Sequence, residues 1–139
     1  MNTLQKFFKQ DNNKPILIEI VKLFHPDIES YKSPKSSKPL SNYLNVYFRY
    51  DWVCIKGNFP DNKYVDIGIC FDIKLSGRGH YMSDFVRILK KDNFIAWRFN
   101  TDYIEEDYPY NIKNINTLFS KYNVPKPTAK EAYNHYYSE

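Results

Sequence analysis

The chain has 139 residues, 42% of them hydrophobic and 26% charged, and a net charge of +4. This length favours a single globular domain over residues 1–139, and the balance of apolar and charged residues excludes a disordered chain. Two cysteines, Cys54 and Cys70, are too few for a disulfide framework, and no apolar run reaches the length of a bilayer span. The N-terminal residues also lack the apolar core of a secretory signal. We therefore expect a cytoplasmic protein with reduced thiols and no cofactor.

Helical patterns open the chain. Residues 3–10 predict a short helix, which residues 11–13, Asp-Asn-Asn, bring to an end. Pro15 suits the first turn of a second helix, whose apolar residues recur with helical spacing at Leu17, Ile20, Val21 and Phe24. A strand is the alternative for this stretch, because Ile and Val favour sheets. Pro26 ends the element, since proline cannot continue the backbone hydrogen bonds.

Residues 27–41 are predicted to form a loop. They contain Pro34, Pro39 and five serines, a composition that resists regular structure. Lysines occur at every third position, at Lys32, Lys35 and Lys38. These lysines could bind phosphate groups, and they equally suit a loop that is simply solvated.

Three stretches with alternating apolar residues follow, over residues 43–50, 52–59 and 64–75. The longest has apolar residues at every odd position, so one of its faces should be buried and the other mostly polar. We expect this strand in the middle of an antiparallel sheet, with Ile69 and Phe71 nearly fully buried beneath the helices.

The turn before the longest strand sets its predicted register. A loop from Pro60 to Tyr64 holds the turn-forming residues Asp and Asn. It would place Phe59 opposite Val65, Ile55 opposite Ile69, Val53 opposite Phe71 and Cys54 opposite Cys70. This register matches apolar residues along one face, and a slip of one residue would break the match.

The remainder of the chain mixes both kinds of element. Residues 94–99 predict a strand, and helical spacing recurs over residues 82–91 and 111–122. Thr128 opens a last helix, because the following residues complete a capping box with Glu131. The order of elements predicts an α+β fold, with an antiparallel sheet of about four strands and helices packed on one face.

One pattern points to an enzyme. Ten residues separate Pro60-Asp61 from Asp72-Ile73-Lys74, which resembles the metal-dependent nuclease signature of the restriction-endonuclease-like superfamily. The resemblance implies that Asp61 and Asp72 hold Mg²⁺ and that Lys74 positions a water molecule, with Glu19 completing the site. Carboxylate oxygens are the ligands that Mg²⁺ prefers. Asp is also common in hairpin turns for conformational reasons, which gives Asp61 a purely structural alternative.

A nucleic-acid-binding module is a further alternative, because basic residues occur in two groups along the chain. They are Lys32, Lys35, Lys38, Arg87, Lys90 and Lys91. Nucleic-acid binders usually cluster their charge on one face. The mild net charge permits such binding without requiring it.

Residues 101–111 form a locally acidic, tyrosine-rich segment in a basic chain. Its candidate partner-binding residues are Asp102, Tyr103, Glu105, Glu106, Asp107, Tyr108 and Tyr110. Carboxylates steer association with a basic partner, and tyrosines provide the buried anchors of protein interfaces. The alternative is a solvated connection between a strand and a helix.

In size, composition and its acidic segment, the chain resembles the immunity proteins of bacterial contact-dependent growth inhibition and related polymorphic toxin systems. The resemblance implies a non-enzymatic protein that neutralises a toxin or nuclease domain by one-to-one binding. The same form fits a phage-encoded inhibitor of a host defence nuclease. We therefore expect a protein partner and no membrane, with residues 101–111 as the contact surface.

Overall fold

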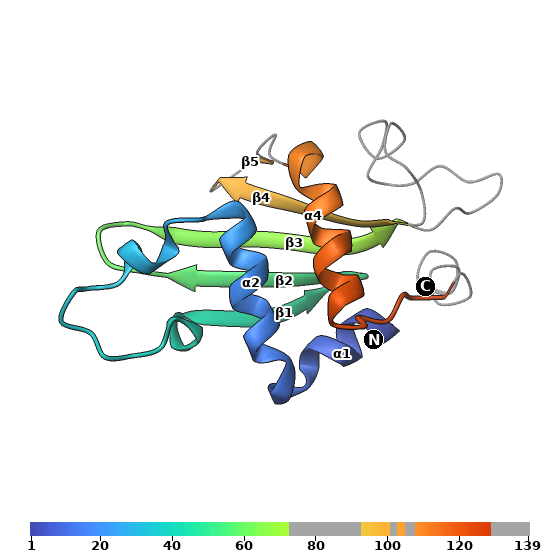
Figure 1. The fold of residues 1–139 in the computed structure, drawn as a ribbon, viewed down its shortest axis with the longest axis horizontal. Helices are drawn as coiled ribbons and strands as arrows, with labels where there is room; N and C mark the ends of the chain where they lie inside the picture. Colours follow the sequence, from blue (N-terminus) through green and yellow to red (C-terminus); the bar gives the residue numbers. More distant parts are fainter. Residues whose placement is uncertain (73–92, 101–102, 105–107, 129–139) are drawn as a thin grey trace.

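A computed structural model describes residues 1–72, 93–100, 103–104 and 108–128 of the chain. Its strands form one antiparallel sheet of five strands in the order β1-β2-β3-β4-β5 (Figure 1). They are β1 (Leu44–Arg49), β2 (Trp52–Asn58), β3 (Tyr64–Asp72), β4 (Asn93–Asn100) and β5 (Tyr103–Ile104). The helices lie against one face of this sheet, and the long strand β3 is in its middle. The predicted α+β fold is thus confirmed.

Helices precede and follow the strands, as the sequence predicted. They are α1 (Thr3–Lys9), α2 (Lys14–Phe24) and α4 (Tyr108–Lys121), with the short 3₁₀ helices η1 (Asp11–Asn13), η2 (Ile28–Tyr31) and η3 (Leu40–Tyr43). The strand alternative for α2 is wrong, and α4 begins at Tyr108 rather than at Asn111. The helix predicted over residues 82–91 lies outside the described residues, as does the one opened by Thr128, apart from Thr128 itself.

Buried polar contacts fix helix α1 to the turn between β1 and β2. The side chain of Asn2 accepts a hydrogen bond from the backbone N–H of Gln5 at 2.9 Å, and Gln5 Oε1 accepts one from the backbone N–H of Asn2 at 3.0 Å. This capping box fixes Gln5, whose Nε2 donates to the carbonyl oxygens of Tyr50 at 2.8 Å and Trp52 at 3.0 Å. Because Gln5 is only 2% exposed, these bonds satisfy a buried amide. These bonds thereby fix the start of the chain to the turn of the β1–β2 hairpin.

The register between β2 and β3 differs from the prediction by two residues. Cys54 lies opposite Gly68 rather than Cys70, and Val53 lies opposite Ile69. The turn is tighter than expected, because Asp61 and Asn62 both have a positive φ, of 60° and 59°. Asp and Asn tolerate this left-handed conformation better than most residues. A shift of two residues keeps every side chain on its predicted face.

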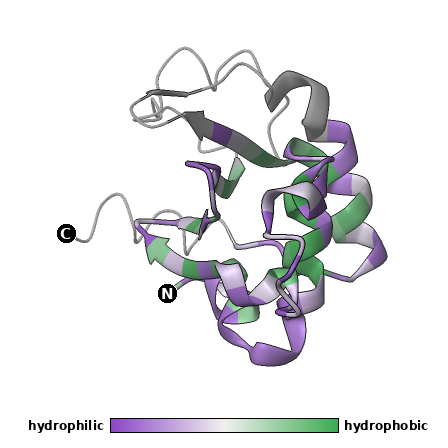
Figure 2. Ribbon diagram, turned by 90° about the vertical axis from the view of Figure 1, so that its left-hand side faces the viewer, coloured by the Kyte–Doolittle hydropathy of each residue, from purple (hydrophilic) through white to green (hydrophobic). Residues whose placement is uncertain are grey.

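The main core lies between the helices and the sheet, where apolar residues of both layers meet (Figure 2). Its fully buried residues include Ile20 and Val21 of α2, Ile115 and Phe119 of α4, and Ile55, Ile67 and Ile69 of the sheet. The ring of Phe119 lies 4.7 Å from that of Phe94 and 5.8 Å from that of Phe8, measured between centroids. Ile69 and Phe71 are buried as predicted, at 0% and 8% exposure.

The face of the sheet that points away from the helices is polar only in part, although a mostly polar second face was predicted for the strand over residues 64–75. Cys70, Ile95 and Trp97 occupy this outer face and are at most 1% exposed. Trp97 stacks on Trp52 with ring centroids 4.7 Å apart. Burial on both faces is typical of strands with a continuous apolar run, and residues 94–97, Phe-Ile-Ala-Trp, are such a run. Among the side chains that the structure describes, the exposed ones on the outer face are on β1 and β2.

The predicted loop 27–41 is more ordered than its composition suggested. It contains η2 and the start of η3. Ile28 is fully buried in the main core, and the Tyr31 ring lies edge-on to that of Phe59 at 5.7 Å. The start of this segment is therefore part of the packed domain rather than a solvated linker.

The β4 side of the sheet is closed by a helix. On α4, Asn116 accepts a hydrogen bond from the backbone N–H of Phe94 and donates one to its carbonyl oxygen, both at 3.0 Å. The amide side chain thus acts as a substitute for a neighbouring strand. Phe94 is 2% exposed, so its backbone groups would otherwise lack partners in a buried place.

We expect Asn116→Ala to lower the free energy of unfolding by about 2 kcal/mol, because it leaves two buried backbone groups without a hydrogen bond. Asn114→Ala is the matched control, since Asn114 is exposed on the same helix and should change stability by less than about 0.5 kcal/mol. Urea denaturation followed by circular dichroism measures both. Equal effects from the two substitutions would show that the Asn116 amide contributes nothing beyond helix propensity.

Candidate functional site

The residues of the nuclease pattern are far apart. Asp61 is in the turn before β3, whereas Asp72 is the last of the nine residues of that strand. At about 3.3 Å per residue, the ends of β3 are roughly 26 Å apart. Mg²⁺ binds its oxygen ligands at about 2.1 Å, so these two carboxylates cannot hold the same ion. Glu19 is on α2, where it accepts a hydrogen bond from the hydroxyl of Tyr122, and Lys74 lies outside the described residues.

The acidic segment is less loop-like than predicted. Tyr103 belongs to β5, which pairs with the end of β4, and Tyr108 and Tyr110 belong to the first turn of α4. Pro109 suits that first turn, because its missing N–H is not needed there. The acidic candidates Asp102, Glu105, Glu106 and Asp107 lie outside the described residues. The prediction that the whole segment connects elements without belonging to one is therefore wrong at these three tyrosines.

The predicted basic groups are only partly described. Lys32 forms a hydrogen bond within its own loop, where its Nζ donates to the carbonyl oxygen of Lys38 at 3.2 Å. Lys35 and Lys38 are exposed. The second group, Arg87, Lys90 and Lys91, lies outside the described residues.

Both thiols are buried and free of a disulfide. Cys54 and Cys70 are 6% and 1% exposed. Burial raises the pKa of the Cys54 thiol. Because the thiolate is the reactive form, such a thiol is a poor nucleophile at neutral pH.

The clearest candidate surface is a group of exposed or half-buried side chains on the outer face of β1, β2 and β3 and in the turn between β1 and β2. We call it the outer patch, and it consists of Tyr47, Arg49, Tyr50, Lys56 and Asp66. Tyr47 and Tyr50 are 37% and 60% exposed. The Nζ of Lys56 is 5.5 Å from the centre of the Tyr47 ring, and the Cζ of Arg49 is 5.6 Å from that of Tyr50. Cation–π contacts of this kind favour the observed ring positions by about 0.5–1 kcal/mol at exposed sites.

Partial burial shapes the electrostatics of the outer patch. It is the main cause that raises the pKa of Tyr47 to about 12, with the neighbouring Cys54 and Asp66 adding to the effect. Burial also raises the pKa of Asp66, while Lys56, its direct partner across β2 and β3, acts in the opposite direction. At neutral pH the patch therefore presents a neutral phenol beside two cations and a carboxylate that is only partly solvated.

Tyr50 has an unfavourable backbone conformation. Its φ of 56° lies in the left-handed region, which costs non-glycine residues about 1–2 kcal/mol and is disfavoured least for Asn and Asp. Strained residues of this kind are concentrated at functional sites. No sequence motif marks the outer patch as a whole. The alternation in residues 43–50 already places Tyr47 and Arg49 on one face, but it carries no signal of the left-handed turn.

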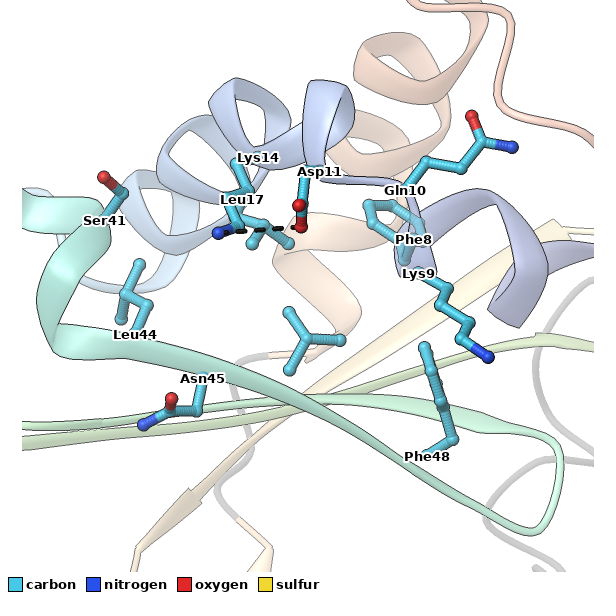
Figure 3. A pocket seen from close by; sticks show the side chains of 11 residues that line it. Phe8, Lys9, Gln10, Asp11, Lys14, Leu17, Ser41, Leu44, Asn45 and Phe48 are labelled. Atoms are coloured by element: carbon cyan, nitrogen blue, oxygen red, sulfur yellow. Dashed lines mark ion pairs between the residues drawn. The ribbon is translucent and has the colours of Figure 1, made fainter.

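A cleft runs beside β1, between this strand and the corner where α1 meets α2 (Figure 3). Its volume is about 240 Å³. Its apolar walls are formed by Phe8, Leu17, Leu44, Val46 and Phe48. Lys9, Asp11 and Lys14 are at its polar rim, where Lys14 and Asp11 form an ion pair at 3.7 Å. We refer to this feature as the β1 cleft.

Comparisons with family models, with curated proteins and with solved structures find no match to this chain. None of the described helices has the length and hydrophobicity of a transmembrane span. Within the described ranges, no three His, Cys, Asp or Glu side chains are close enough to hold a metal ion. Function is therefore inferred from the geometry of the chain itself.

Replacing Tyr50 by Asn should stabilise the protein. We expect a gain of about 0.5–1 kcal/mol in the free energy of unfolding, because Asn adopts the left-handed conformation at a lower cost than Tyr, whereas the cation–π contact with Arg49 that the substitution removes is exposed and weak. Tyr47→Asn is the control: it makes the same chemical change within a strand, where Asn is disfavoured. Chemical denaturation of the two variants checks the sign. A loss of stability in Tyr50→Asn would show that the ring contributes more than the strain costs.

Asp66→Asn should stabilise the protein at neutral pH but not in acid. The folded state raises the pKa of Asp66 above its usual 3.8, so ionisation of this group costs more in the folded than in the unfolded chain. The stability that wild type retains below pH 3.8 is lost as the pH rises through the folded pKa. The advantage of the variant should therefore appear between acid and neutral pH. Urea midpoints across this range measure it, and a constant difference would show that Asp66 titrates normally.

Proposed function

We propose that this chain is a small cytoplasmic binding protein that neutralises a toxin or nuclease domain by forming a one-to-one complex with it. The observation that best supports a protein partner is the outer patch. Tyr and Arg are among the residues that contribute most to protein interfaces. Here Tyr47 and Tyr50 are exposed, and their contacts with Lys56 and Arg49 favour the observed ring positions, which reduces the side-chain entropy that binding costs.

Tyr50 supports the proposal through its strain as well as its exposure. A turn with a φ of 56° would be more stable with Asn or Gly. The chain instead has a large aromatic residue there, 60% exposed to solvent. A contact with a partner gives this arrangement a use that stability alone does not.

The acidic segment remains part of the proposal as a steering element. Its carboxylates, Asp102, Glu105, Glu106 and Asp107, would attract a basic partner such as a nucleic-acid-cleaving domain. Attraction of this kind acts mainly on the rate of association and weakens as salt is added. The outer patch, by contrast, would act on the rate of dissociation.

The experiment co-expresses the full chain in bacteria with the product of each gene that flanks its own, and it first requires that one of these products is toxic when expressed alone. We expect growth to be restored and a one-to-one complex to be recovered by size-exclusion chromatography with light scattering. In surface plasmon resonance, Tyr50→Asn should dissociate faster and weaken binding by about 2 kcal/mol. Because this variant should be more stable than wild type, lost binding could not be attributed to unfolding.

Two further variants distinguish the contribution of the acidic segment from that of the outer patch. Glu105→Lys combined with Glu106→Lys should slow association and flatten its salt dependence, and Lys113→Glu on the exposed side of α4 serves as the charge control. Unchanged growth protection and kinetics in all the variants would contradict the assignment of both surfaces. Magnesium-dependent cleavage of plasmid DNA by the purified chain, abolished by Asp72→Asn, would replace the proposal with the nuclease alternative.

A further inference from the structure

The two edges of the sheet differ in how their backbone groups are satisfied. On the β4 edge, β5 pairs with residues Phe99 and Asn100, and the Asn116 side chain bonds Phe94. On the other edge, β1 pairs with β2 alone among the described strands. An edge strand of this kind is a template on which a further strand can pair.

Hydrogen-bond alternation identifies which groups of β1 point outward. Arg49 and Trp52 pair directly around a two-residue turn, so they exchange the hydrogen bonds of the hairpin. Alternation then directs the N–H and C=O groups of Val46 and Phe48 away from β2. The same alternation, followed through β2 and β3 to β4, predicts that the N–H and C=O groups of Phe94 point away from β3. Asn116 forms hydrogen bonds with both of these groups. The contact between Asn116 and Phe94 thus confirms independently which backbone groups point outward.

The β1 cleft opens beside these outward groups. In Figure 3, Phe8 and Leu17 approach from the helices, while Leu44 and Phe48 approach from β1. A cavity of about 150 Å³ with apolar walls can hold a benzene ring. The β1 cleft, at about 240 Å³, therefore has room for one large apolar side chain.

We propose that β1 binds an extended segment of a partner protein as an additional strand, with one large apolar side chain of that segment inserted into the β1 cleft and an acidic residue beside it contacting Lys9. This inference does not rest on the partner being a toxin. It requires only that a partner offers such a segment.

The pleat of the sheet dictates the pattern of the bound segment. Residues directly opposite each other in paired strands point to the same face. A residue opposite Val46 or Phe48 therefore points toward the helices and the cleft, and a residue opposite Tyr47 points to the outer patch. The segment should accordingly alternate, with apolar residues two positions apart.

The charges at the rim of the β1 cleft favour an acidic residue in the bound segment. Lys14 is paired with Asp11, whereas Lys9 forms no ion pair with the described residues. Lys9 lies in the last turn of α1 and is exposed at the rim of the cleft. A carboxylate on the bound segment would complement it, and partial burial of the pair would reduce its screening by salt.

The occupant is a partner segment rather than a second copy of this chain. The corner formed by α1, η1 and the start of α2 lies beside β1, past the edge of the sheet (Figure 1). We place a single added strand between this corner and β1, with one of its side chains in the β1 cleft. A second copy paired edge to edge would bring its own corner into the same space.

The test begins with a random peptide library displayed on phage and selected against the full chain. We expect enriched peptides to share an alternating pattern of large apolar residues with an Asp or Glu nearby. A fluorescein-labelled version of the best peptide is then measured by fluorescence polarisation. Methylating its backbone nitrogens one at a time should weaken binding about fivefold or more at alternate positions only, because alternate N–H groups face β1.

Two protein variants locate the site. Lys9→Glu should weaken binding of this peptide about fivefold or more, and Lys6→Glu, on the same helix but away from the cleft, should leave it unchanged. Val46→Pro removes an outward N–H that β2 does not use, a substitution that edge strands tolerate. It should abolish binding while the circular dichroism spectrum is retained.

Several results would overturn the inference. They are a library that enriches no alternating pattern, methylation effects without a period of two, and equal effects of the Lys9 and Lys6 variants. A stable dimer in sedimentation that Val46→Pro dissolves would assign the edge to a second copy. Binding of a single-stranded oligonucleotide that Lys9→Glu weakens, with no peptide binding, would assign it to nucleic acid.

Discussion

The need of every edge N–H and C=O group for a partner governs the organisation of this protein. At the β4 edge the chain supplies partners for Phe94, from the Asn116 side chain of α4, and for the end of the strand, from β5. At the β1 edge, the buried Gln5 amide fixes α1 to the hairpin turn instead of to the strand. The helix therefore stands beside β1 without bonding its outward groups, and the β1 cleft lies between them. One edge is thus partly covered by the fold, and we propose that the other binds a partner.

The faces of the sheet could be predicted from the sequence, but the register could not. Alternation over residues 64–72 assigns Ile69 to the core whichever residue lies opposite, because a shift of two positions preserves the face. The partner of Cys54 depends on the length of the turn, and that length follows from the left-handed conformations of Asp61 and Asn62. Hydrophobic pattern contains no information on those two angles. The burial of Trp97 on the outer face was readable from an unbroken apolar run in β4, which favours burial on both sides.

The candidate site was predictable only where it depends on one strand. Tyr47 and Arg49 follow the alternation of β1, so their exposure on a common face could be read from the sequence. The β1 cleft could not, since it brings Lys9 at the end of α1 next to Val46 of β1 through long-range packing. Asp61 and Asp72 show the opposite case, in which residues near each other in sequence are far apart in space. They are close enough in sequence to look like a metal site, but a strand keeps them at its opposite ends.

The outer patch and the β1 cleft share a strand, and this has a mechanical consequence. Tyr47 points to the outer face, whereas Val46 and Phe48 on either side of it point to the cleft. A strand paired with β1 would lie about 4.8 Å from it, so its outward side chains would reach Tyr47 and the Lys56 ammonium that lies over that ring. Backbone bonds to β1 would provide affinity for any extended segment, and the two sets of side-chain contacts would provide selectivity. A partner that fits the cleft but carries a bulky cation opposite Tyr47 would meet Lys56 and Arg49, so the same strand that recruits partners also rejects some of them.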